Sequence, residues 1–332
     1  MDRSRASAIS AAASLCCRGL LIAAAVTFSV PGSAQAQDQL KLAVGAPHNW
    51  ENQPAALGQQ AGIFKKHGLV LELLFTQGSG ETMQAVIAGS VDIGTGVGTY
   101  GAMGAFAKGA PVRAIGNATT GAHDLYWYVR ADSPIRRLAD AGDKTTIGYS
   151  ASGSSSHNVV LAFARELGIK AAPTATGTQP ATLTQVMSGQ IDIGWSAPPF
   201  ALKELAEGKI RIIANGNDAP SMRTQTVRVD MVNANVFKER NDVVLRFVRA
   251  YRETLDWMFS SPDAIRIYAE QMNVPVELAA TTRDKFQTRE AMRNDRLSDL
   301  DAVMADAVQL KFLDRPLSKE QLAELIQIPA LQ

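Results

Sequence analysis

The chain has 332 residues, enough for two ordinary domains, and 46% of them are hydrophobic, which suits a packed globular protein rather than a disordered one. Its 33 basic and 32 acidic side chains nearly cancel, so the chain lacks the basic excess that nucleic-acid binding requires. The two cysteines, Cys16 and Cys17, are adjacent and cannot by themselves form a disulfide framework or a cysteine-based zinc site.

The first 36 residues have the pattern of a secretory signal peptide. A basic start that includes Arg3 and Arg5 precedes an apolar run of 12 residues over 19–30, and small residues at 34 and 36 suit cleavage by a signal peptidase. The run is too short to span a bilayer, which takes about 20 apolar residues. Cleavage after Ala36 leaves 296 residues, no cysteine and a net charge of −1. We therefore predict a signal peptide over 1–36, Sec-type export and a periplasmic location.

Short apolar runs then alternate with helical patterns along the chain. The runs predict strands over 40–45, 69–75, 91–94, 112–116, 125–130, 145–149 and 210–214. Helices are expected between them, for example over 81–88 and 158–167, and the chain becomes helical from Asn241. This alternation predicts an α/β fold, with parallel strands and helices on both faces of each sheet.

One block of sequence occurs twice, 100 residues apart. VIAGSVDIG at 86–94 matches VMSGQIDIG at 186–194, and a helix, a glycine and an apolar strand follow each copy. Each block has the pattern of a helix end, a glycine cap and a buried strand. The alternative is chance recurrence of a common pattern. The joint match favours two similar lobes of about 100 residues each, a period far too long for a solenoid.

The loops after the strands are the predicted binding region, because ligands of open parallel sheets bind beyond the carboxyl ends of the strands. These loops are rich in Gly, Ser and Thr, and two tryptophans offer apolar walls. The candidate ligand-binding residues are Asn49, Trp50, Gln77, Gly78, Ser79, Gly96, Val97, Thr119, Thr120, Gly153, Ser154, Ser155, His157 and Trp195. The Ser154–Ser156 loop before a helix is either an oxyanion-binding loop or a solvated helix cap.

Patterns for catalysis and metal binding are sparse. The mature chain has no cysteine nucleophile, and its four histidines lack the spacing of metal ligands. Gly96–Gly101 matches G-x-G-x-x-G, but the next strand lacks the acidic residue that would hold a ribose. We predict no enzyme activity, no catalytic residue, no metal and no cofactor. The alternative is a secreted serine-dependent hydrolase that uses Ser155 and His157, although no G-x-S-x-G motif occurs.

Three stretches resemble the solute-binding proteins of ABC importers, in particular the nitrate/sulfonate/taurine group that includes binders of the thiamine pyrimidine precursor: WENQPAALGQQAGIFKKHGL at 50–69, QGSGETMQAVIAGSVDIGTG at 77–96 and SGQIDIGWSAPP at 188–199. The resemblance spans nearly all of the mature chain. It implies a two-lobed periplasmic-binding-protein fold of type II-like topology, each lobe a mostly parallel sheet flanked by helices. Two crossing strands, near 120–124 and 218–226, would form the hinge. The implied first lobe covers 37–122, the second 123–220, and residues 221–332 return to the first.

The resemblance implies a monomer that closes on a small solute and delivers it to an inner-membrane permease. The predicted loops contain no Arg or Lys, whereas Glu51, Glu81 and Asp124 lie near them. A strongly anionic ligand such as nitrate therefore fits less well than a sulfonate- or taurine-like zwitterion or an aromatic or heterocyclic solute. Some enzymes share the implied fold, a desulfinase and a pyrimidine synthase among them. Both rely on cysteine chemistry, and the mature chain has no cysteine.

Overall fold

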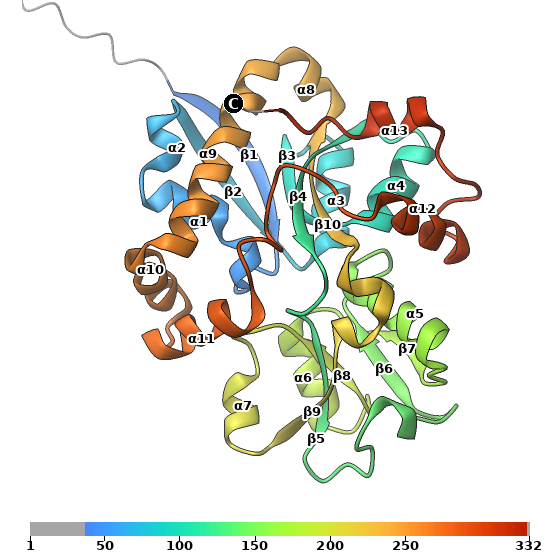
Figure 1. Cartoon of the computed structure of the whole chain (residues 1–332). Helices are drawn as coiled ribbons and strands as arrows, with labels where there is room; N and C mark the ends of the chain where they lie inside the picture. The colour runs from blue at the N-terminus through green and yellow to red at the C-terminus, as the bar shows by residue number, and fades with distance from the viewer. Residues whose placement is uncertain (1–36, 331–332) are drawn as a thin grey trace, which may run out of the picture. The chain divides into compact units, whose positions relative to one another are not determined.

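The computed structural model describes residues 37–330, so the predicted signal peptide over 1–36 lies outside the described residues. The strands of the described part form two groups, each with its own helices (Figure 1). We call the group around β1–β4 and β10 the first lobe and the group around β5–β9 the second lobe. No helix within residues 37–330 is long and apolar enough to cross a membrane.

A five-stranded sheet forms the centre of the first lobe. Its strands, in the order β2-β1-β3-β10-β4, are β1 (Asp38–Gly45), β2 (Leu69–Thr76), β3 (Ile93–Gly98), β4 (Val112–Thr120) and β10 (Thr226–Asn233). β1 pairs in parallel with β2 and β3, whereas β10 is antiparallel to both β3 and β4. Only β10 is therefore reversed. It is buried along its whole length, between two neighbours.

The second lobe repeats this arrangement. Its strands are β5 (Tyr126–Arg130), β6 (Thr146–Tyr149), β7 (Ala172–Ala175), β8 (Gly194–Ser196) and β9 (Ile210–Asn215). β6 and β7 are parallel, β5 is antiparallel between β8 and β9, and a parallel bridge from Ile147 to Ile193 connects the two sets. In each lobe the reversed strand is the one that arrives from the other lobe. The prediction of two lobes with mostly parallel sheets is confirmed.

The helices cover both sheets, and the C-terminal helices return to the first lobe. The helical segments before β10 are η1 (Trp50–Asn52), α1 (Pro54–Gln60), α2 (Ile63–Lys66), α3 (Ser79–Ile87), α4 (Thr99–Ala107), η2 (Leu138–Asp140), α5 (Ser155–Leu167), α6 (Gln179–Met187), α7 (Leu202–Ala206), η3 (Gly216–Asp218) and η4 (Pro220–Arg223). Those after β10 are α8 (Ala234–Glu239), α9 (Asn241–Ser260), α10 (Pro262–Met272), α11 (Val276–Phe286), α12 (Leu300–Gln309) and α13 (Lys319–Leu325). α9 packs on α1 and α2, α12 on α4 and α13 on β4 (Figure 1).

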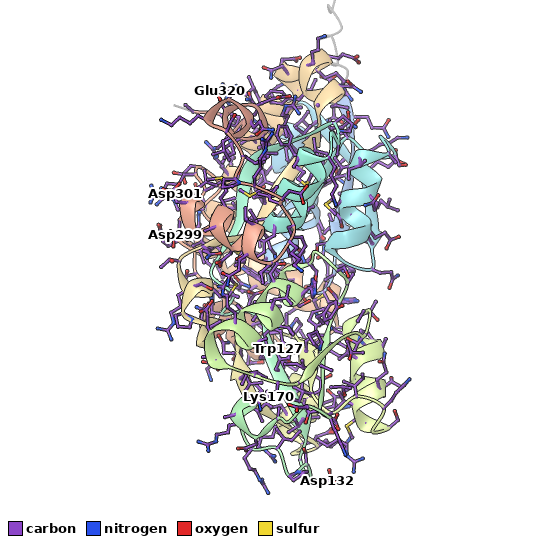
Figure 2. All side chains as sticks on the ribbon, turned by 90° about the vertical axis from the view of Figure 1, so that its right-hand side faces the viewer. Trp127, Asp132, Lys170, Asp299, Asp301 and Glu320 are labelled. Atoms are coloured by element: carbon purple, nitrogen blue, oxygen red, sulfur yellow. The ribbon has the colours of Figure 1, made fainter. Side chains whose placement is uncertain are left out.

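Apolar spacing decides how these elements pack. The stripe of α9 that the sequence predicts, which includes Val244, Phe247 and Tyr251, is buried against the first lobe. Phe247 stacks on Phe64 of α2 with 5.7 Å between ring centroids. In the second lobe Trp127 of β5, marked in Figure 2, is fully buried and donates a hydrogen bond from Nε1 to the Gly148 carbonyl at 3.0 Å.

The two aspartates of the repeated block perform the same structural task. The Asp92 carboxylate accepts a hydrogen bond from the backbone N–H of Lys41 at 2.8 Å, and Asp192 accepts one from Thr146, also at 2.8 Å. Each aspartate thus ties the start of one strand to its parallel neighbour. Both carboxylates therefore have a structural role in the sheets.

A second matched pair shows that the repeat extends beyond the block. The hydroxyls of Thr76 and Thr82 lie 2.7 Å apart, and those of Thr176 and Thr182 lie 2.7 Å apart as well. In both lobes the pair joins the end of a strand to the helix that follows. The offset is again 100 residues, so similar residues build the corresponding corner of each lobe.

Two strand predictions need correction. β3 continues to Gly98, so residues 95–98 form strand rather than the expected turn, although Gly96 has the positive φ of 70° that favours glycine. β10 was not predicted at all: the expected second crossing ended near residue 226, and no strand was expected in the segment after it. The segments between β4 and β5 and between β9 and β10 connect the two lobes, and the second of them contains η3 and η4 rather than a strand.

Candidate functional site

Two adjoining cavities lie between the lobes. The larger has a volume of about 230 Å³ and is lined by Ala46, Pro47, His48, Asn49, Phe75, Thr76, Gln77, Thr178, Gln179, Pro180, Trp195 and Phe200. The smaller, of about 40 Å³, is lined by Gly45, Ala46, Asn49, Glu51, Asn52, Gln77, Gly78, Ser79, Gly96, Leu125, Ser150, Ser154, Ser155, Ser156, Trp195 and Arg228. Four residues line both, so the cavities lie side by side. Together they offer one compact polar end and one wider end with apolar walls, which we call the polar end and the apolar end.

The loop after β1 is held rigidly at the cavity. Its residue Asn52 donates a hydrogen bond from Nδ2 to the Ala46 carbonyl at 3.3 Å, and Gln53 donates one from Nε2 to the Asn49 carbonyl at 3.3 Å. These contacts close the loop on itself. Asn49 and Glu51 consequently point to the cavity without needing support from a ligand.

Trp50 lies in the core of the first lobe rather than in the cavity. Its ring is fully buried and meets Phe259 and Tyr268 edge to face, with centroid distances of 6.0 and 5.0 Å. The tight η1 turn directs neighbouring side chains to opposite sides, so Glu51 faces the cavity and Trp50 faces α9 and α10. The residue anchors the loop and does not form the apolar wall that the sequence suggested.

The serine loop before α5 caps the helix and lines the polar end. Ser154 Oγ accepts a hydrogen bond from the backbone N–H of His157 at 3.2 Å, which satisfies one free amide at the helix N-terminus. Ser155 Oγ accepts one from Arg228 Nε at 2.9 Å. Ser156 Oγ accepts one from the backbone N–H of Ser150 at 3.0 Å. The loop therefore caps α5, which was one of the two alternatives, and its oxyanion-binding role stays a prediction.

His157 lies outside the cavity. Its ring sits 4.3 Å from the ring of Tyr149, and its Nδ1 accepts a hydrogen bond from the Gly153 backbone N–H at 3.2 Å. Burial lowers the pKa of His157. The structure shows no hydrogen bond between His157 and the hydroxyl of Ser155, which is engaged by Arg228. The arrangement does not provide the nucleophile–base contact that a serine hydrolase needs.

A buried charged cluster of Glu51, Asp124 and Arg228 forms the floor of the polar end. Arg228 Nη1 lies 2.9 Å from Asp124 Oδ2 and 3.8 Å from Glu51 Oε1. The three side chains are 3%, 0% and 5% exposed in the order Glu51, Asp124, Arg228. Burial, and then the neighbouring charge of Asp124, raise the pKa of Glu51 to about 7. Two acidic groups thus share one base.

Sequence reasoning missed Arg228 because it considered only the ends of strands. β10 is reversed, so its beginning lies at the edge of the sheet where the parallel strands end. The register confirms this: Arg228 pairs with Gly98 near the end of β3 and with Thr119 near the end of β4. The signal was the alternating TVRVDMVN segment after the second crossing, with an arginine at its start.

The lobes touch each other beside the cavity. Gln179 Nε2 of the second lobe donates a hydrogen bond to Asn49 Oδ1 of the first at 2.9 Å, and both residues are buried. At another point a Cβ on Gly98 would lie 2.3 Å from the carbonyl oxygen of Gly153, so only glycine permits this approach. Arg165 of α5 makes a two-point ion pair with Asp306 of α12 at 2.6 and 2.9 Å.

The cavity gathers eight of the fourteen predicted binding residues: Asn49, Gln77, Gly78, Ser79, Gly96, Ser154, Ser155 and Trp195. Six lie outside it: Trp50, Val97, Thr119, Thr120, Gly153 and His157. Val97 and Thr119 are strand residues buried in the sheet, and Thr120 lines a separate groove beside the hinge. Among residues 37–330, no group of His, Cys, Asp and Glu side chains is arranged to hold a metal ion.

Comparison with known proteins agrees with this architecture. A family model described as NMT1/THI5 like matches residues 49–265, almost two thirds of the chain. A protein of Escherichia coli (strain K12), named as an aliphatic sulfonates-binding protein, is 27% identical over 213 residues, which span 61% of this chain and 63% of that protein. The chain thus covers less than two thirds of that relative.

Solved structures show the same fold. The periplasmic aliphatic sulphonate binding protein SsuA from Escherichia coli superposes with a TM-score of 0.67 at 18% identity, covering 89% of this chain and 94% of that one. The desulfurization enzyme DSZB superposes with a TM-score of 0.60, also at 18% identity, over 86% of this chain and 96% of that one. At such identities the likeness establishes the fold, and the fold alone carries both binding proteins and an enzyme.

Proposed function

This chain belongs to the NMT1/THI5 like family, and we propose that it is the periplasmic solute-binding component of an ABC importer. In this role it captures a small polar organic solute between its lobes and presents the closed form to a membrane permease. The observation that carries the proposal is the cavity itself. Both lobes supply its walls, and the two segments that connect the lobes allow it to open and close.

The two ends of the cavity suit a solute with a polar head and an apolar or aromatic body. Serine hydroxyls, the start of α5 and the charged cluster surround the polar end, whereas Phe75, Trp195 and Phe200 line the apolar end. Aliphatic sulfonates, taurine-like zwitterions and heterocycles have this shape. The sulfonate-binding relative supports the first of these classes.

We expect binding without turnover. The lack of a Ser155–His157 contact weighs against the hydrolase alternative, and the mature chain has no cysteine for thiol chemistry. The desulfurization enzyme with this fold keeps the question open to experiment. Incubating the protein with each solute that binds, and then recovering that solute unchanged, would support a receptor. Conversion of the solute would refute it.

A thermal-shift screen of the mature chain tests the function directly. Sulfonates, amino acids, carboxylates and pyrimidines would be screened, and hits measured by isothermal titration calorimetry. A stoichiometry of one solute per chain is expected.

Gln179→Ala removes a contact between the lobes at the cavity and should weaken binding by about tenfold. Gln271→Ala, on the surface of α10, is the matched control and should bind like the unmodified protein. Absence of stabilisation by every solute would contradict the proposal.

A further inference from the structure

Glu51 is an unusual residue to find in the wall of a binding cavity. Its side chain is only 3% exposed, yet it lines the polar end beside the serine loop. The rigid loop around it and the buried ring of Trp50 fix its position. A carboxyl group held this firmly against a cavity is placed to contact whatever occupies the cavity.

The protein itself satisfies this carboxyl group poorly. Oε1 accepts one hydrogen bond from Asn49 Nδ2 at 3.1 Å, and Oε2 accepts a long one from Gln287 Nε2 at 3.4 Å. An ionised carboxylate has about four acceptor positions, and buried ones are normally filled. Glu51 therefore retains unused acceptor capacity.

The base beside Glu51, Arg228, also contacts other groups. Arg228 lies 2.9 Å from Asp124 and gives its Nε hydrogen bond to Ser155, so its distance to Glu51 is 3.8 Å. Both Asp124 oxygens, Gln287 Oε1 and Arg228 Nη1 are buried without a hydrogen-bond partner among the described residues, although Nη1 lies 2.9 Å from Asp124 Oδ2 as an ion pair. Two acidic side chains thus face the single positive charge of Arg228, which favours a hydrogen-bond donor over a further anion beside Glu51.

We propose that Glu51 accepts a hydrogen bond from the bound solute, so that the site selects solutes carrying an amine, amide or ring N–H over simple anions of similar size. This inference rests on the proposed function and names the solute class within it. The acidic group would contact the donor, while the hydroxyls of the serine loop remain free to meet a second polar group of the solute.

Two matched pairs of probes test this selectivity. The first pair is 2-aminoethanesulfonate against ethanesulfonate, and the second is 4-aminopyrimidine against pyrimidine. Losing a hydrogen bond to a charged group lowers the affinity by a factor of about 10 to 100. In at least one pair, the probe with the amino group should therefore bind more tightly than its partner by that factor. Glu51→Gln should reduce the preference to within about threefold, and Glu72→Gln, an exposed control on β2, should leave it unchanged.

The results separate this inference from the proposed function. Tighter binding of ethanesulfonate and pyrimidine than of their amine partners overturns the selectivity but supports a solute receptor. An unchanged preference in Glu51→Gln also overturns it. If none of the four probes binds, the inference fails, whereas the proposed function still depends on the wider screen.

Proton exchange supplies a second test that needs no variant. The charged groups that face Glu51 are Arg228 and Asp124, and the hydroxyls of Tyr251 and Tyr268 behind it stay protonated because burial raises their pKa values. Because its raised pKa leaves Glu51 partly protonated near neutral pH, a donor that binds the ionised carboxylate should release protons on binding. Calorimetry of the tightest probe in two buffers of different ionisation enthalpy measures this. Proton uptake would overturn the inference.

Discussion

Replacing Arg228 with methionine tests how far the cluster at the polar end depends on its single base. Asp124 is fully buried, and its oxygens have no hydrogen-bond partner among residues 37–330, so Arg228 at 2.9 Å is its main compensation. Removing one member of a buried ion pair costs about 3–5 kcal/mol, because the remaining charge is left without a partner in a poorly solvating site. The unfolding entropy of the 294 described residues is about 0.6 kcal/mol per kelvin, so Arg228→Met should lower the Tm by roughly 5–8 °C.

Urea and thermal unfolding at pH 7 measure the effect without any solute. The double variant Arg228→Met with Asp124→Leu removes both charges and should lose less stability than Arg228→Met alone, since apolar groups often replace a buried pair at little cost. Arg266→Met is the surface control: its ion pairs at 2.9 and 3.3 Å are more than half exposed, and it should cost less than about 1 kcal/mol. A single variant as stable as the unmodified protein would refute the argument.

Three further predictions follow from the geometry. Gly98→Ala should weaken solute binding by about 5- to 100-fold, measured by calorimetry, because its Cβ meets the second lobe at 2.3 Å; Gly142→Ala, with open space around it, should bind normally. Burial raises the pKa values of Glu51 and Asp230 to about 7, so between about pH 4 and 7 the folded state holds protons that the unfolded state releases. The free energy of unfolding should therefore fall as the pH rises through this range. In urea unfolding, Glu51→Gln or Asp230→Asn should reduce this fall by up to about 3 kcal/mol. Asp306→Asn breaks an ion pair between the lobes and should cost about 1–3 kcal/mol in the same assay, whereas an unchanged midpoint would show that the pair adds nothing.

Periodicity and one repeated block were sufficient to predict the two lobes. The block indicated where a helix ends and a buried strand begins, and its two aspartates, Asp92 and Asp192, make equivalent hydrogen bonds in the two lobes. Eight of fourteen predicted binding residues line the cavity, since the rule that ligands bind at strand ends locates a loop correctly. The rule does not say which way each side chain points. Trp50 shows the consequence: it lies in the right loop and faces the core.

Arg228 shows a different limit. A binding residue on a reversed strand lies at the cavity only because the chain crosses between lobes, and sequence alone does not reveal that direction. The negative charge of the loops suggested that the site holds no base. The structure corrects this: a base is present, but two acidic groups balance it. That a simple anion fits poorly stays a prediction, and it now depends on this balance of charges rather than on the absence of a base.

The repeat also explains why the cavity has two unlike ends. Thr76 and Thr82 in one lobe and Thr176 and Thr182 in the other build the same corner, so the lobes bring equivalent edges to the cavity. Selectivity for one solute over another is then expected at positions where the two lobes carry different residues. Trp195 stands 100 residues after Thr95, which is buried in the first sheet, so the aromatic wall that Trp195 adds to the cavity has no counterpart at the equivalent position of the first lobe. Glu51 supplies charge from the other side. We therefore expect an asymmetric solute, with an apolar or aromatic body at the apolar end and its donor group toward Glu51.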